Sequence, residues 1–153
     1  MSSERKASTS SWEALACLKA EGRSVIEYSH GKKLKRDQVI DVECDIWIPA
    51  ARPDVIDEDN VERLNTRLVV EGANIPITPG AEKMLHERGV LCVPDFIANA
   101  GGVICAAMEY QNASQSVALQ TIEEKLRINT VQVLETAKKE HILPREAAVN
   151  LAT

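Results

Sequence analysis

The most informative segment of the sequence is Val93–Tyr110, which reads VPDFIANAGGVICAAMEY. It follows a short apolar run, and Pro94 cannot donate a strand hydrogen bond, so we expect a buried strand at residues 90–93 to end there. Asp95 opens a turn, and Asn99–Gly102 carries little side-chain bulk where a helix should begin, with Val103, Ala106 and Ala107 on its apolar side. Small residues at such a junction let a ligand approach backbone N–H groups. They equally suit a packed connection without a ligand, and the residues alone leave both interpretations open.

The segments before this stretch predict two further alternations of strand and helix. Residues 45–49 and 67–71 are apolar in the middle, as parallel strands buried on both faces should be. We expect a helix at 57–65 with Val61 and Leu64 inward, and a second at 79–88, for which Thr78 is the N-cap and Glu82 completes a capping box. Three such alternations imply a parallel sheet, whose sites lie beyond the carboxyl ends of its strands.

The flanking segments predict mostly helix. The Ser-rich residues 1–11 should be flexible, with a transit peptide as the alternative interpretation. We expect a helix at 12–21 with Trp12, Leu15, Cys17 and Leu18 largely on one side, a short edge strand from Val25, Ile26 and Tyr28, and a helix at 36–42. Residues 116–141 predict one long helix, and Pro144 begins a short one with Ala147, Ala148 and Leu151 inward. The expected domains are 1–11, 12–115 and the helical extension 116–153.

Composition excludes several functions for a chain of this kind. The 153 residues carry a formal charge of −5 and 3% aromatics, which argues against a nucleic-acid partner. No apolar run approaches the ~20 residues of a membrane helix. The cysteines, Cys17, Cys44, Cys92 and Cys105, are too scattered for a metal site, and we expect buried thiols in a reducing, cytoplasmic compartment.

Three motifs together resemble one enzyme family. Pro94–Phe96 followed by Asn99–Val103 resembles the signature of the glutamate, leucine, phenylalanine and valine dehydrogenase family. Residues 45–51 (DIWIPAA) and 70–74 (VEGAN) resemble its two preceding strand ends, in the same order. The likeness covers roughly residues 12–152 and looks closest to glutamate dehydrogenase. It implies an α/β fold: part of a three-layer, Rossmann-like domain with a parallel sheet and a C-terminal helical extension.

The resemblance implies a cofactor site and a reaction. The family oxidatively deaminates an L-amino acid to a 2-oxo acid and ammonia, with NAD or NADP as hydride acceptor. At matching positions, the small residues Ala50 and Ala51 would lie against the cofactor, and Gly101 and Gly102 would let the helix come close to it. Asn74 would form a hydrogen bond near the nicotinamide ribose, and Asn99 would bind the nicotinamide amide. For each Asn the alternative is a turn-forming residue bonded to its own backbone.

Departures from the family pattern limit the expected activity. The Gly-rich turn G-x-G-x-x-G and the acidic residue that follows it are missing from the sequence. The family's substrate domain, with its catalytic lysine and aspartate, has no counterpart either, so no catalytic residue is assigned and the isolated chain should be inactive. Ala106 stands at a substrate-binding position where many glutamate dehydrogenases have serine, which leaves the amino acid open.

Two further interpretations stay open. Half a sheet leaves an unpaired strand edge, so the chain could be a non-catalytic dinucleotide-binding or assembly module that forms a homo-oligomer or docks on a longer subunit. Alternatively, the sequence is a piece of a longer gene product.

Overall fold

The computed structural model describes residues 11–152, which divide into two compact units between Val39 and Ile40. The predicted flexible leader lies outside the described residues except for Ser11. The second unit holds the sheet and every residue of the predicted cofactor site.

The first unit is built from short helices. The predicted first helix is confirmed as α1 (Ser11–Ala20), but its apolar side is not buried, and Trp12 is 77% exposed. The strand predicted from Val25, Ile26 and Tyr28 is wrong, because these residues lie in and beside the 3-10 helix η1 (Val25–Glu27). Ser24 and Glu27 form a reciprocal capping box there, which closes a turn instead of extending the chain. The helix expected at 36–42 is a 3-10 helix, η2 (Arg36–Asp41).

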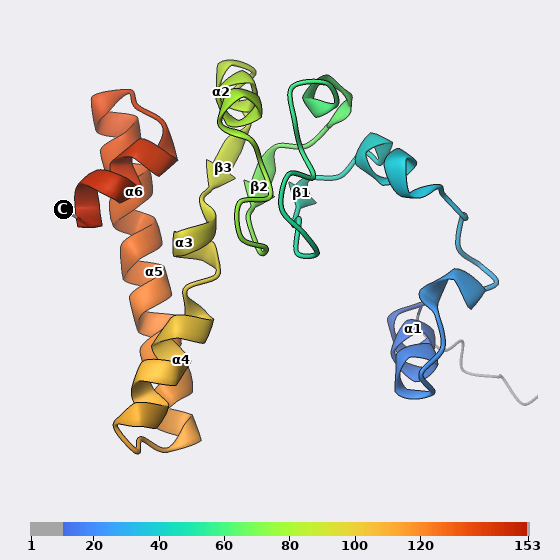
Figure 1. Cartoon of the computed structure of the whole chain (residues 1–153), viewed down its shortest axis with the longest axis horizontal. Coiled ribbons are helices and arrows are strands. Elements are labelled where there is room, and N and C mark those ends of the chain that lie inside the picture. Colours follow the sequence, from blue (N-terminus) through green and yellow to red (C-terminus); the bar gives the residue numbers. More distant parts are fainter. Residues whose placement is uncertain (1–10, 153) are drawn as a thin grey trace, which may run out of the picture. The chain divides into compact units, whose positions relative to one another are not determined.

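The second unit contains the predicted parallel sheet, with strands β1 (Ile46–Trp47), β2 (Leu68–Val70) and β3 (Leu91–Val93) in the order β1-β2-β3 (Figure 1). Leu68 stands opposite Ile46 on one side and Leu91 on the other. All three strands lie within the predicted segments and are shorter than expected. The carboxyl ends of the strands therefore meet at one edge, as the sequence indicated.

The connection from β1 to β2 is less helical than predicted. Only the 3-10 helix η3 (Val61–Arg63) forms where a helix was expected over 57–65. Asp57 accepts from the N–H of Asn60 at 3.0 Å and so closes a turn just before it. Val61 and Leu64 are nevertheless fully buried, as predicted.

The connection from β2 to β3 contains helix α2 (Pro79–Glu87). Thr78 is its N-cap, as predicted, and accepts from the N–H of Ala81 at 3.3 Å. Gly89, with φ of 77°, follows its end. The capping box predicted for Glu82 is wrong, because that carboxylate is buried and binds Arg145 of the last helix.

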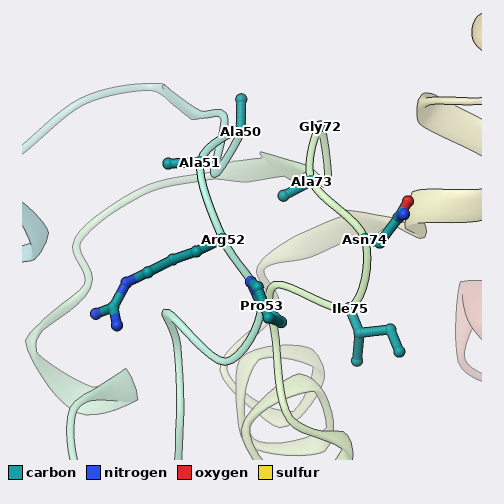
Figure 2. Close-up of a pocket in the computed structure, with 8 residues that line it drawn as sticks. All are labelled: Ala50, Ala51, Arg52, Pro53, Gly72, Ala73, Asn74 and Ile75. Atoms are coloured by element: carbon teal, nitrogen blue, oxygen red, sulfur yellow. The ribbon is translucent and has the colours of Figure 1, made fainter.

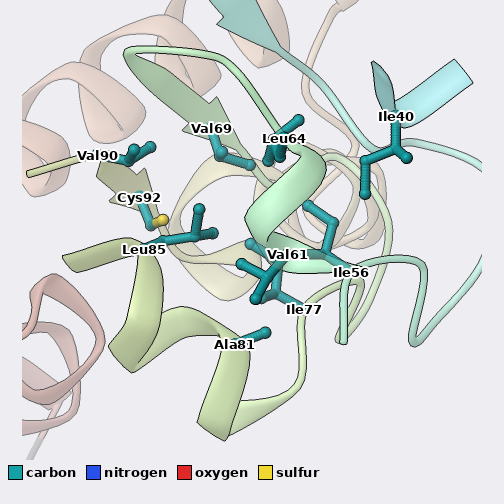
Figure 3. Packing of buried hydrophobic residues seen from close by; sticks show 10 residues of the cluster. All are labelled: Ile40, Ile56, Val61, Leu64, Val69, Ile77, Ala81, Leu85, Val90 and Cys92. Carbon is teal, nitrogen blue, oxygen red and sulfur yellow. The ribbon is translucent and has the colours of Figure 1, made fainter. Parts of the chain in front are cut away.

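Two apolar clusters cover the two faces of the sheet. Strand residues alternate between faces, so Val69 and Cys92 join one cluster with η3 and α2, which Figure 3 shows. Val93 joins the other, with Val133 and Ala137 of helix α5 (Gln115–Glu140) and Ala147 and Ala148 of helix α6 (Pro144–Ala152). The result is the predicted three-layer α/β arrangement. Leu151 departs from it, because it is 47% exposed and not inward.

The stretch after β3 forms two helices, α3 (Asp95–Ala98) and α4 (Gly101–Tyr110). The predicted inner side of α4 is wrong: Val103 is 77% exposed and Ala106 and Ala107 are exposed, whereas Ile104 and Met108 are half-buried. The expectation of buried thiols holds only for Cys92; Cys17 is exposed, and Cys44 and Cys105 are half-buried. Within residues 11–152, none of the helices has the length and apolar character needed to cross a bilayer.

Candidate functional site

An open hollow of about 510 Å³ lies at the carboxyl ends of β1 and β2 (Figure 2). The loops that follow the two strands run side by side there. Its lining comes entirely from these loops: Ala50, Ala51, Arg52, Pro53, Gly72, Ala73, Asn74 and Ile75. Three of the predicted cofactor-binding residues, Ala50, Ala51 and Asn74, are therefore brought together in one concave site.

Gly72 sets how closely the two loops approach. A Cβ built at Gly72 would lie 3.1 Å from Ala50 Cβ, which is tighter than ordinary contact, and 3.4 Å from Ile48 Cγ2, which is ordinary contact. The next residue, Ala73, donates its N–H to the carbonyl of Pro49 at 2.8 Å. Glycine therefore lets the two loops approach without displacing Ala50.

Backbone hydrogen bonds also fix the far end of the hollow. Asp54 donates to the carbonyl of Ile75 at 3.0 Å, and Val55 and Ile56 both donate to that of Pro76 at 2.8 and 3.0 Å. Ile75 has φ of 48°, a left-handed conformation that a β-branched residue rarely adopts. The loop after β2 is therefore held in a defined and unusual conformation.

Asn74 and Asn99 form a side-chain pair beside the hollow. Asn99 Nδ2 donates to Asn74 Oδ1 at 2.8 Å. The side chain of Asn74 points away from the loop of Ala50 and Ala51 (Figure 2). The bond uses one donor of Asn99 and one acceptor of Asn74, so Asn99 Oδ1 and the amide nitrogen of Asn74 remain available for other hydrogen bonds.

The other predicted site residues lie outside the hollow. Gly101 faces helix α5, where a Cβ would lie 3.3 Å from Ile122 Cγ2, so its lack of a side chain serves the contact between α4 and α5. A Cβ on Gly102 would meet open space. Ala106 is exposed on α4 and does not line the hollow.

A buried ionic cluster lies under the same edge of the sheet, and sequence reasoning missed it. Arg145 at the start of α6 donates to three carboxylates: Nε to Glu82 at 2.6 Å, Nη1 to Asp95 at 3.0 Å, and Nη2 to both oxygens of Glu71 at 2.9 and 3.0 Å. Glu71, Glu82 and Asp95 are all buried. Asp95 also accepts from the N–H of Ile75 at 2.9 Å, which connects the cluster to the hollow.

The pKa values of Glu71 and Asp95 in this cluster shift in opposite directions. Burial raises the pKa of Glu71 to about 7, against the attraction of Arg145 and with the repulsion of Glu82 and Asp95. Burial also opposes ionisation of Asp95, but the hydrogen bonds from Ile75 and Arg145 outweigh it and hold the pKa of Asp95 below its usual value. Glu82 Oε1 is buried without a hydrogen-bond partner among the described residues. Three carboxylates thus compete for one guanidinium.

One sequence signal could have found this cluster. Glu71 directly continues the apolar run Leu68–Val70 and shares its buried setting, and a buried charge requires a partner. The partner itself could not be found from spacing, because Arg145 lies 74 residues further on.

A parallel α/β sheet with a hollow beyond the carboxyl ends of its strands has the arrangement of Rossmann-like folds, which bind their ligands at that edge. The sequence profile of the family described as "Glutamate/Leucine/Phenylalanine/Valine dehydrogenase" matches residues 6–153, and the chain belongs to this family.

Individual relatives agree with this assignment. The chain is 37% identical over 140 residues to "Glutamate dehydrogenase" of Aeropyrum pernix, covering 88% of this chain and 33% of the relative. It is 48% identical over 89 residues to "NADP(+)-dependent glutamate dehydrogenase" of Pyrobaculum calidifontis, covering 58% and 21%. The fold matches the hetero-hexameric glutamate dehydrogenase from Thermus thermophilus with a TM-score of 0.75 at 24% identity, covering 92% and 34%. The chain therefore spans about a third or less of the length of these relatives.

Proposed function

We propose that this chain forms the nicotinamide side of the cofactor site of an NAD- or NADP-dependent amino-acid dehydrogenase of glutamate type. The observation that carries this proposal is the hollow formed by Ala50, Ala51, Gly72 and Asn74, with the Asn74–Asn99 pair beside it. The relatives' names supply the substrate class and the cofactor. Oxidative deamination of an L-amino acid to a 2-oxo acid and ammonia is the reaction proposed for the assembled enzyme.

The residues of the hollow suit a nicotinamide nucleoside. Ala50, Ala51 and Gly72 would admit a flat ring close to the backbone, since larger side chains would fill the hollow. Asn99 Oδ1 and the amide nitrogen of Asn74 would pair with the donor and acceptor of a carboxamide and so orient the ring. When bound, the nicotinamide accepts a hydride from the substrate. The role of this chain's residues is to hold and orient that ring, because positioning supplies much of the rate.

Several finer assignments belong to the same proposal. Residues 12–115 would make the partial cofactor domain and 116–153 the helical extension, with Gly101 and Gly102 close to the cofactor and Ala106 near the substrate. The partners would be an amino acid or 2-oxo acid and further subunits, as the hexameric relative suggests. A cytoplasmic location is proposed because the described cysteines are free and widely spaced.

An assembly module is the second candidate, and the edge of the sheet favours it. β1 pairs only with β2 among the described strands, and Ile46 and Ile48 on this edge are 54% and 61% exposed. Exposed apolar strand edges pair readily with another chain. A second copy or a longer subunit would cover this edge.

Saturation-transfer NMR tests the proposed function with the two halves of the cofactor, nicotinamide mononucleotide and adenosine monophosphate, offered separately. The sequence contains no Gly-rich pyrophosphate turn, so nicotinamide mononucleotide should receive saturation from the chain and adenosine monophosphate should not. Asn99→Ala removes the amide pair at an accessible position, and we expect it to lose the nicotinamide signal while it stays folded. Equal signals from both nucleotides, or none from the nicotinamide, would contradict the proposal. The isolated chain should not reduce NAD or NADP with glutamate.

A further inference from the structure

Arg145 joins four parts of the second unit that are distant in the sequence. It stands at the start of α6, and its guanidinium binds Glu71 at the end of β2, Glu82 on α2 and Asp95 at the start of α3. It also lies over the ring of Phe96, 5.6 Å from the ring centre. The three carboxylates are almost completely buried and share this one cation. Such a cluster fixes geometry, because each charge depends on the others for a partner.

Asp95 connects this cluster to the loop that lines the hollow. Its Oδ1 accepts from Arg145 Nη1 at 3.0 Å, while its Oδ2 accepts from the N–H of Ile75 at 2.9 Å. Ile75 is left-handed, with φ of 48°, and such a conformation persists only where its surroundings determine it. Side-chain packing supplies little of this support, because Ile75 is 58% exposed. Hydrogen bonds to its backbone must therefore hold it.

We propose that Arg145 is a positioning residue that, through Asp95, holds Ile75 and with it the segment Gly72–Ile75 that lines the hollow. Arg145 itself does not line the hollow. Its influence on cofactor binding rests on the proposed function, whereas its influence on the loop stands by itself. Helix α6, near the end of the chain, thereby sets the shape of a site built from two loops some 70 to 100 residues earlier.

The geometry requires an arginine. The N–H groups of a guanidinium point in several directions within one plane, so a single side chain can bind three carboxylates on three elements. A lysine would keep the charge but would concentrate it at one point. Arg145→Lys should therefore keep the charge of the cluster unchanged while it loosens the hydrogen bond that the Ile75 N–H donates to Asp95.

Arg88 provides a matched control. It follows the end of α2, and its guanidinium donates to the carbonyls at the two ends of η3, Val61 at 2.6 Å and Leu64 at 2.7 Å. It lies near the opposite ends of the strands, together with Asp45 and Arg67. Arg88→Met should lower the overall stability without a specific effect on Ile75.

Amide hydrogen exchange on the full 153-residue chain tests the proposal. The readout is the exchange rate of Ile75 divided by that of Leu85, an amide of the core helix α2. We expect Arg145→Met to raise this ratio about tenfold or more, because Asp95 without Arg145 no longer holds the hydrogen bond from the Ile75 N–H. The same variant should shift the Ile75 cross-peak. Arg145→Lys should raise the ratio less, and Arg88→Met should leave it unchanged. If Arg145→Met does not fold, the lysine variant decides.

An unchanged exchange ratio in the Arg145 variants that fold would overturn the proposal. An equal rise of the ratio in Arg88→Met would also overturn it. Binding of nicotinamide mononucleotide is measured separately on the same samples. A wild-type chain that fails to bind it would overturn the proposed function, while the exchange result would still decide the role of Arg145.

Discussion

Replacement of Glu71 by Gln should flatten the pH dependence of stability. Glu71 is fully buried, and its pKa rises from 4.5 to about 7 in the folded chain. The folded state therefore holds this proton more tightly than the unfolded chain. The stability gained from the protonated Glu71 is fully present below pH 4.5 and is lost as the pH rises through about 7. At about 1.4 kcal/mol per pKa unit, the loss between about pH 5 and about pH 8 is roughly 2 to 3 kcal/mol.

Urea unfolding at a series of pH values measures this loss. The wild-type free energy of unfolding should fall over that interval, whereas Glu71→Gln, which keeps an oxygen that can accept from Arg145, should show a much smaller fall. Asp95 acts in the opposite sense at lower pH, because its pKa is depressed and its contribution is lost on acidification. Glu87→Gln, on the exposed end of α2, is the control and should follow the wild type. Equal slopes for Glu71→Gln and the wild type would show that Glu71 does not take up a proton in this range.

Three further predictions follow from packing and burial. Gly72→Val should cost about 1 to 3 kcal/mol in urea unfolding, because its side chain would collide with Ala50. Leu85→Ala empties a fully buried position and should cost about 2 to 5 kcal/mol in the same assay. Iodoacetamide followed by mass spectrometry should label the exposed Cys17 in the native chain and Cys92 only after unfolding, because burial raises the pKa of Cys92 to about 12.

The sheet and its functional edge could be predicted because they depend on local patterns. Short apolar runs ended by Pro94 or followed by small residues indicated the strands, and Thr78 with Pro79 indicated the start of α2. Parallel strands bring their carboxyl ends together, so Ala51 and Asn74 had to lie near one another. These expectations required no knowledge of long-range contacts.

The errors arose where a local pattern met a partner that sequence spacing does not reveal. Glu82 fits a capping box, but Arg145 binds its carboxylate more than sixty residues away. Val25 and Ile26 are typical of strands, but Ser24 and Glu27 close a turn around them. In α4 the buried side follows the approach of α5, which packs against Gly101. Side-chain type alone could not determine that orientation.

Nicotinamide mononucleotide can be mapped onto the ¹⁵N-labelled chain by its effects on backbone cross-peaks. We expect shifts at Ala51, at Gly72–Ile75 and at Asn99, at the carboxyl ends of the strands. Shifts confined to the opposite ends of the strands, around Arg67 and Gly89, or no saturable shift at all, would contradict the proposed cofactor site.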